Sequence, residues 1–139
     1  MKQAQESLRI ATRGPGLYEI TDDVVAWTKR QDIAAGLLTL YSRHTSASLV
    51  IQENADPQVM EDLQRFFRRL VPDGDPLFRH TAEGPDDMPA HVKSALTQTS
   101  LNVPVRGGRP LLGTWQGIYL FEHRAQPHAR EIALHLLGE

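Results

Sequence analysis

The order of the strand-like segments limits the fold of this chain more than any other feature of its sequence. These segments come mostly in consecutive pairs, and helices do not separate them one by one. Neighbouring strands with short connections pair antiparallel, whereas parallel strands need a long crossover. The sequence therefore predicts an α+β fold with about seven mostly antiparallel strands and about three helices, in the order ββαββααβββ.

The strands are predicted from alternating polarity and from short apolar runs that turn residues interrupt. The clearest strand is the last one, where Ile132, Leu134 and Leu136 fall on one face. The predicted strands cover residues 7–13, 17–20, 37–42, 47–53, 101–105 and 129–137, with one or two more within 107–124.

Two helix starts are predicted from capping residues. Thr21 is expected to cap a first helix that runs to about Ala35, with Gly36 as the C′ residue. Asp56 followed by Pro57 is typical of a second helix start, because the aspartate accepts a backbone hydrogen bond and the proline has no amide hydrogen to leave unpaired.

The second helix is expected to place one face in the core, because its apolar residues recur at the helical period. These residues are Val59, Met60, Leu63, Phe66, Phe67 and Leu70. A loop rich in proline and glycine follows over residues 72–88, and long loops in compact domains often carry function. A short third helix is expected over residues 89–98.

Composition restricts the chemistry and the compartment. The 139 residues suit a single domain over residues 1–139, and the net charge of -2 gives no indication of nucleic-acid binding. The absence of cysteine means that His, Asp or Glu would have to hold any metal. Residues 1–6 contain no apolar signal segment, and no run approaches the roughly 20 apolar residues of a membrane span, so we expect a cytoplasmic protein.

Four of the six histidines lie at the ends of predicted elements or in the long loop, where side chains from different elements can meet at one metal. They are His44, His80, His91 and His123. For each of them the alternative is a solvated or locally bonded histidine. The short motifs of P-loop proteins, zinc proteases and serine hydrolases are absent.

Carboxylates lie near the same positions. Glu53 ends a strand, where it would either orient a histidine or be exposed to solvent. Asp86 and Asp87 precede the third helix, and one of them is expected to cap it. Glu122 is a candidate general base, with a surface ion pair to Arg124 as the alternative.

Five separated segments together carry a family resemblance. They are residues 44–47 (His-Thr-Ser-Ala), 53–57 (Glu-Asn-Ala-Asp-Pro), 86–91 (Asp-Asp-Met-Pro-Ala-His), 113–117 (Gly-Thr-Trp-Gln-Gly) and 122–124 (Glu-His-Arg). The chain resembles the YjbQ family, whose members are also called secondary thiamine-phosphate synthases. The similarity runs in order over nearly the whole chain, and its most specific part is the segment from Ser100 to Ile118.

The resemblance implies two packed sheets, a homotrimer and a divalent metal ion, with zinc expected and magnesium as the alternative for a diphosphate substrate. The implied metal ligands are His44, His80 and His91. The implied catalytic candidates are Glu53, Asp87, Glu122 and His123. The implied substrate-binding candidates are Thr45, Ser46, Gln116 and Arg124. Residues 113–116 are interpreted as facing a pocket or a neighbouring subunit, although core packing would explain Trp115 equally well.

The activity implied by the resemblance is thiamine-phosphate synthesis, as the main reaction or as a side activity. This reaction joins hydroxymethylpyrimidine diphosphate to a thiazole phosphate and releases pyrophosphate, so positive charge is needed at the leaving group. The alternatives are a metal-assisted hydrolase of a phosphorylated or anionic metabolite and a non-enzymatic trimeric metabolite-binding module. We expect a phosphorylated small molecule as the ligand, and neither nucleic acid nor a membrane as a partner.

Overall fold

The computed structural model describes residues 1–139 and confirms the α+β class. Eight strands and three helices follow one another in the order ββαββααββββ. The strand beyond the predicted seven is β6 (Arg109–Pro110), which is only two residues long. None of the three helices combines the length and the apolar character that crossing a membrane requires.

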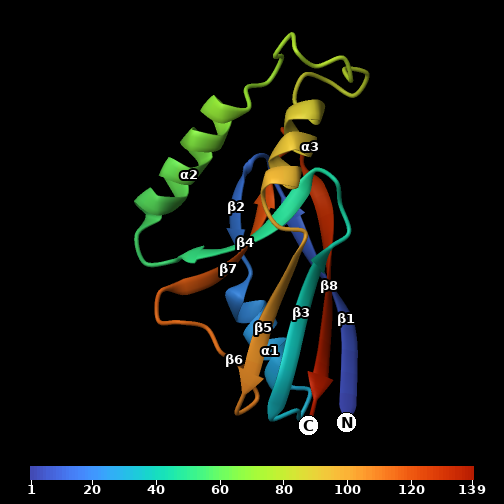
Figure 1. Cartoon of the computed structure of the whole chain (residues 1–139), viewed down its shortest axis with the longest axis vertical. Coiled ribbons are helices and arrows are strands. Elements are labelled where there is room, and N and C mark those ends of the chain that lie inside the picture. The colour runs from blue at the N-terminus through green and yellow to red at the C-terminus, as the bar shows by residue number, and fades with distance from the viewer.

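The strands form two antiparallel sheets (Figure 1). The larger sheet has the order β1-β8-β3-β5-β6, and the smaller one has the order β2-β7-β4. The bounds in the larger sheet are β1 (Lys2–Thr12), β8 (His128–Gly138), β3 (Ala35–Ser42) and β5 (Ser100–Arg106). The bounds in the smaller sheet are β2 (Gly16–Glu19), β7 (Gln116–Glu122) and β4 (Ala47–Glu53).

One cluster of 16 buried apolar residues takes side chains from both sheets and from α1 (Thr21–Lys29). Strand β8 contributes Ile132, Leu134 and Leu136, which confirms the predicted alternation. Trp27 of α1 is 4% exposed, as expected for a core residue. Both chain termini lie at the end of the larger sheet that is remote from α3 (Figure 1).

The first helix is shorter than predicted. It ends at Lys29, and Gly36 is not its C′ residue but part of β3. A Cβ at Gly36 would come within 2.2 Å of the Leu137 carbonyl oxygen, so glycine there permits the close approach of β3 and β8. Thr21 is the first helical residue rather than the cap, and its hydroxyl accepts a hydrogen bond from the Ile118 amide at 2.8 Å.

The second helix, α2 (Pro57–Leu70), begins as predicted, because the Asp56 carboxylate accepts a hydrogen bond from the Gln58 amide at 3.0 Å. The prediction that this helix places a face in the core is wrong, because none of its residues is buried. Phe66 is 49% and Leu70 is 53% exposed. In Figure 1 the helix stands beside the sheets without being covered on its outer side.

A tight turn between Arg106 and Arg109 joins β5 to β6 in a hairpin. Gly107 and Gly108 have φ angles of 61° and 74°. Both angles lie in the left-handed region, where a side chain would be strained.

Candidate functional site

A cluster of two histidines and one aspartate lies where the long loop meets the start of α3 (Asp87–Leu96). Asp87 and His91 are one helical turn apart on α3, so their side chains project from the same face. His80 reaches the cluster from the loop. Its Nε2 lies 2.8 Å from Asp87 Oδ2, and His91 Nε2 lies 3.3 Å from the same oxygen. All three potential ligand atoms lie within 4.8 Å of one another.

The hydrogen bonds of His91 fix which of its nitrogens is free. Its Nδ1 lies 3.1 Å from the Thr45 carbonyl oxygen, which can only accept, so Nδ1 carries the proton. In the neutral ring, Nε2 therefore presents a lone pair to a carboxylate oxygen. This contact is favourable only if His91 takes up a second proton or a cation lies between the two atoms.

The donor set fits a divalent metal. Two imidazole nitrogens and one carboxylate oxygen form the kind of three-ligand set that holds catalytic zinc with one position open. The backbone carbonyl that orients His91 through Nδ1 is also a usual feature of a ligating histidine. His80 is about half exposed and Asp87 is buried, so solvent reaches the cluster through the histidines and not through the carboxylate.

Arg124 lies behind Asp87 and fixes its orientation. Arg124 Nη1 donates to Asp87 Oδ1 at 2.8 Å, and its Nε donates to Asp86 Oδ2 at 2.9 Å. Burial alone would raise the pKa of Asp87, but the His80 hydrogen bond and the Arg124 charge outweigh it and hold that pKa below its ordinary value. Arg124 also donates to the Glu83 carbonyl. Its contacts therefore place it as support for Asp87 rather than in an open substrate pocket.

Asp86 occupies the N-cap position of α3 but makes no side-chain capping bond, so the predicted cap is wrong. Its carboxylate binds Arg124 and also accepts a hydrogen bond from the Ala125 amide at 2.9 Å. Burial opposes ionisation of Asp86, but these bonds outweigh it and lower its pKa. Asp86 thus ties the start of α3 to the segment after β7.

Two hollows adjoin the cluster. The larger has a volume of about 630 Å³, and His91 lies in its wall together with His44 and Thr45. The smaller has a volume of about 310 Å³, and His80 lies in its wall. A metal ion at the cluster could therefore be reached by a small molecule in either hollow.

The structure does not bring His44 into the cluster, in contrast to the predicted set of three histidines. His44 Nε2 accepts a hydrogen bond from the Glu131 amide at 2.8 Å. Burial, reinforced by the charge of Arg130, lowers the pKa of His44, so its ring is neutral with the proton on Nδ1. Neither nitrogen then offers a free lone pair, and Asp87 completes the cluster instead.

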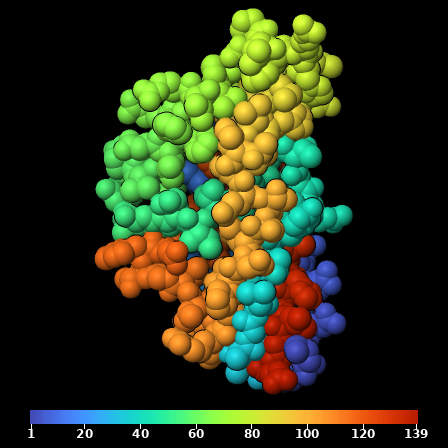
Figure 2. Space-filling model, in the orientation of Figure 1, coloured from blue at the N-terminus to red at the C-terminus, as the bar shows by residue number.

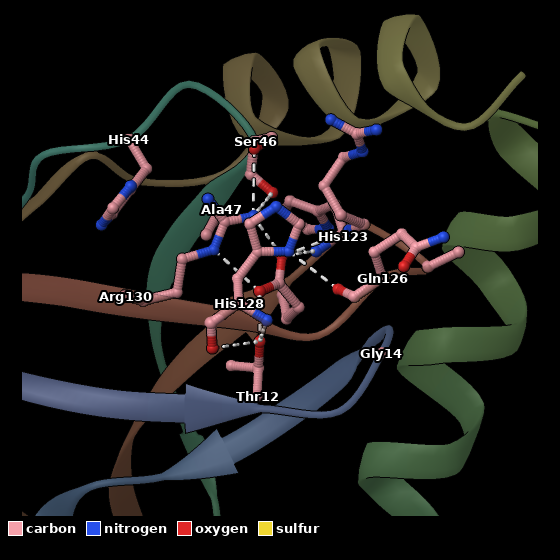
Figure 3. Close-up of polar contacts among 12 residues, drawn as sticks. Thr12, Gly14, His44, Ser46, Ala47, His123, Gln126, His128 and Arg130 are labelled. Carbon is pink, nitrogen blue, oxygen red and sulfur yellow. Dashed lines mark hydrogen bonds and ion pairs between the residues drawn. The ribbon is translucent and has the colours of Figure 1, made fainter. Parts of the chain in front are cut away.

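Glu122 lies in a buried network and not at the surface. Figure 3 shows Thr12 and Arg130, two of its partners, pointing toward the centre of this network. Its Oε1 accepts hydrogen bonds from Thr12 Oγ1 at 2.6 Å and from Arg130 Nε at 2.7 Å. Its Oε2 accepts from Arg130 Nη2 and from the amides of His123 and Arg124. Glu122 is 0% exposed and pairs with Arg130, so the alternative of a surface ion pair with Arg124 is wrong, and these donors occupy both oxygens of the predicted general base.

Arg130 supplies the positive charge of this network and was not among the residues predicted for a site. Its Nη2 also donates to Ser46 Oγ at 3.0 Å, so Ser46 is buried against Arg130 and does not line either hollow. The alternation of β8 could have indicated this position. Arg130 has the same parity as Ile132 and Leu134, so its side chain must point inward with theirs.

His123 is buried and neutral. Burial, followed by the charge of Lys93, lowers its pKa to about 3. Its Nε2 lies 2.9 Å from Ser48 Oγ, and its ring centroid lies 4.4 Å from that of Phe121. Because neighbouring residues of an extended segment point to opposite sides, His123 faces away from the side that Glu122 and Arg124 occupy.

Glu53 and Gln116 lie at the opposite end of the smaller sheet from Glu122. They face each other in the register of β4 and β7, where Ala47 pairs with Glu122 at the other end. The seven residues of β4 separate the two ends by roughly 20 Å, so this chain does not place Glu53 or Gln116 at the cluster. Trp115 is 63% exposed, which excludes the alternative of a core tryptophan.

The fold and the cluster define a class of small α+β proteins with two antiparallel sheets and a His-Asp-His cluster at the start of a helix. The sequence profile of the family described as "UPF0047 protein YjbQ-like" matches residues 6–139. The chain belongs to this family.

Relatives cover nearly the whole chain. A UPF0047 protein of Synechocystis is 51% identical over 138 residues, which is 99% of this chain and 94% of that protein. The UPF0047 protein YjbQ of Escherichia coli is 44% identical over 97% of this chain and 98% of its own length.

Solved structures show the same fold. A hypothetical protein of Aeropyrum pernix superposes with a TM-score of 0.85 at 32% identity and covers 100% of both chains. A conserved hypothetical protein of Thermus thermophilus gives a TM-score of 0.84 at 36% identity, over 95% of this chain and 99% of its own.

Proposed function

We propose that this protein is a metal-dependent enzyme that acts on a phosphorylated small molecule. The observation that carries the proposal is the 3.3 Å contact between His91 Nε2 and Asp87 Oδ2. Both atoms are acceptors when the ring is neutral, and a divalent cation would satisfy both. Zinc fits the two imidazoles best, and magnesium is the alternative if a diphosphate supplies further ligands.

The specific reaction that we propose, from the family resemblance, is thiamine-phosphate synthesis. A bound cation would offset the negative charge that develops on the departing pyrophosphate. The cation would be held by His80, Asp87 and His91. Arg124 would favour the ionised form of Asp87 and fix the orientation of its carboxylate. Ser94 and Thr99 line the larger hollow, and the buried Ser94 Oγ has no hydrogen-bond partner within the chain.

The hydrolase alternative would need a general base near the cluster. Glu122 is fully buried and accepts five hydrogen bonds, so it cannot supply that base. Transfer of the hydroxymethylpyrimidine group to the thiazole phosphate, with the diphosphate leaving as pyrophosphate, is therefore the better supported proposal, and the non-enzymatic binding module remains the outcome if no turnover is found.

We also propose that the protein assembles as a homotrimer. The outer face of the larger sheet carries exposed apolar side chains, among them Leu37 and Leu137, which are direct neighbours on β3 and β8. Tyr41, at 49% exposure, also lines the larger hollow. A neighbouring subunit that covers this face would therefore border the hollow as well.

The deciding experiment combines metal analysis with activity. Wild type should bind about one divalent ion per subunit and turn over hydroxymethylpyrimidine diphosphate with thiazole phosphate, or another phosphorylated substrate from a panel. His91→Ala should lose both properties, whereas His135→Ala, which removes a histidine of β8 outside the cluster, should keep both. Full activity in metal-free wild type would refute the metal role, and tight ligand retention without turnover would support a binding module.

A further inference from the structure

Lys93 is a buried cation without a partner. It is 7% exposed, and its Nζ makes no hydrogen bond and no ion pair within the chain. It lies two residues beyond His91 on α3, so the two side chains point about 200° apart around the helix axis. Lys93 therefore faces the side of α3 that is turned away from the metal cluster.

A small cavity lies at Lys93, between α3, α2 and the smaller sheet. Its volume is about 20 Å³, which is enough for one atom of the size of a water oxygen. Arg68 and Gln64 of α2 line it together with Lys93, and the neutral ring of His123 adds no charge there. Figure 2 shows an opening between the green surface of α2 and the orange surface of α3, so the cavity side of these helices reaches solvent.

No carboxylate neutralises this charge. Glu122 lines the cavity, but both its oxygens are engaged by Arg130 and by other donors. The charges of the Asp73 and Asp86 carboxylates act on Lys93 from a distance, and Arg68 adds a charge of the same sign as its own. Asp73 nevertheless makes no ion pair with Lys93. The Lys93 side chain is thus largely surrounded by protein while its ammonium group has no anion within ion-pair distance, and a bound anion would supply that partner.

We propose that this cavity is an anion-binding subsite that takes one oxygen of a phosphoryl group against Lys93, with Arg68 and Gln64 holding the other oxygens at its mouth. The planar guanidinium of Arg68 and the amide of Gln64 present several donors, which suits a tetrahedral oxyanion better than a halide. The subsite is separate from the His-Asp-His cluster, and the proposal does not depend on the metal-dependent function.

The test is calorimetric titration of metal-free protein in chloride-free buffer with inorganic phosphate and, separately, with phenyl phosphate. Lys93→Met and Arg68→Met should each weaken binding by about tenfold or more, because each removes a charge-assisted contact. Arg65→Met removes the same charge from a position of α2 that does not line the cavity and should change the affinity less than about twofold. His91→Ala should bind phosphate as wild type does, which separates this subsite from the metal cluster.

The two ligands distinguish the source of the phosphoryl group. Binding of both means that the subsite accepts phosphate esters, and binding of inorganic phosphate alone means that it holds the free ion; either result supports the proposal. Unchanged phosphate affinity in Lys93→Met, or binding of chloride but not of phosphate, would overturn it. If Lys93→Met does not fold, the comparison of Arg68→Met with Arg65→Met decides, because both residues are exposed.

Discussion

Asp87 Oδ2 lies 3.3 Å from His91 Nε2, although neither atom can donate a hydrogen bond to the other while the histidine is neutral. His80 Nε2 approaches the same oxygen at 2.8 Å. The three side chains are therefore arranged as our proposal of a bound divalent cation requires.

The support from Arg124 should be measurable as metal affinity. We expect Arg124→Gln to weaken zinc binding about 10- to 100-fold, because Asp87 loses the bond that orients it and the charge that keeps it ionised. Competition against a chelator measures this change. Arg109→Gln removes the same charge from the remote end of the larger sheet and should have no effect, and equal affinities of the two variants would contradict the assigned role.

The buried pair of Glu122 and Arg130 should dominate the effect of charge on stability. We expect Glu122→Gln to lower the free energy of unfolding by about 3 kcal/mol, because Arg130 would remain buried without its counter-charge. Glu131→Gln removes the neighbouring, partly exposed charge on β8 and should cost less than about 1 kcal/mol. Urea unfolding compares the two variants, and similar losses would refute this assignment.

The same pair predicts that the protein loses folding stability at low pH. Burial would raise the pKa of Glu122, but hydrogen bonds from Arg130 and Thr12 outweigh it and hold that pKa below 4.5. A carboxyl group with a lowered folded-state pKa contributes its full stability above its unfolded pKa and loses it as the pH falls through the folded one. The contribution of Glu122 should therefore be complete above about pH 4.5 and be lost as the pH falls from there through the folded-state pKa. The free energy of unfolding of Glu122→Gln should depend less on pH in this range.

His123 should cause a second loss of stability as the pH falls, and this loss should begin at a higher pH than the loss due to Glu122. Its pKa falls from 6.5 to about 3 on folding, so the unfolded chain binds one more proton between these values. The free energy of unfolding should fall by about 1.4 kcal/mol for each unit that the pH drops within this window. His123→Phe keeps an aromatic ring against Phe121 and should remove the His123 part of this slope, leaving the part due to His44, whereas His128→Phe, at a partly exposed position, should keep the full slope.

The proposed trimer makes a prediction about the outer face of the larger sheet. Leu137→Glu should convert the trimer to a monomer, because it places a charge within the apolar face that a neighbouring subunit would cover. Leu77→Glu changes a leucine of the long loop that is 77% exposed and should leave the trimer intact. Size-exclusion chromatography with light scattering measures both, and a monomeric wild type would contradict the proposal directly.

Features that depend on a few neighbouring residues could be predicted from the sequence. The start of α2 follows from Asp56 and Pro57, and the inward face of β8 follows from alternation. The end of α1 was mistaken because Gly36 resembles a helix C′ residue. Its actual role is to let β3 approach β8, which depends on residues about 100 positions away.

The apolar face of α2 shows a different limit. Spacing correctly indicates which residues share a face, Phe66 and Leu70 among them, but it does not indicate what covers that face. In this chain the face is only partly covered, since Phe67 packs against Phe121 while Phe66 and Leu70 stay exposed beside the sheets.

The sequence by itself determined the α+β class, the antiparallel pairing and the set of residues from which a site could be built. Strand and helix periods are local, so they can be read along the chain. Only the tertiary structure decided that Asp87 joins His80 and His91, that His44 and Glu122 are engaged elsewhere, and that Lys93 is left without a partner. These outcomes depend on strand register and on the path of the long loop. Both bring together atoms that are far apart in the sequence, so local sequence patterns do not predict the contacts.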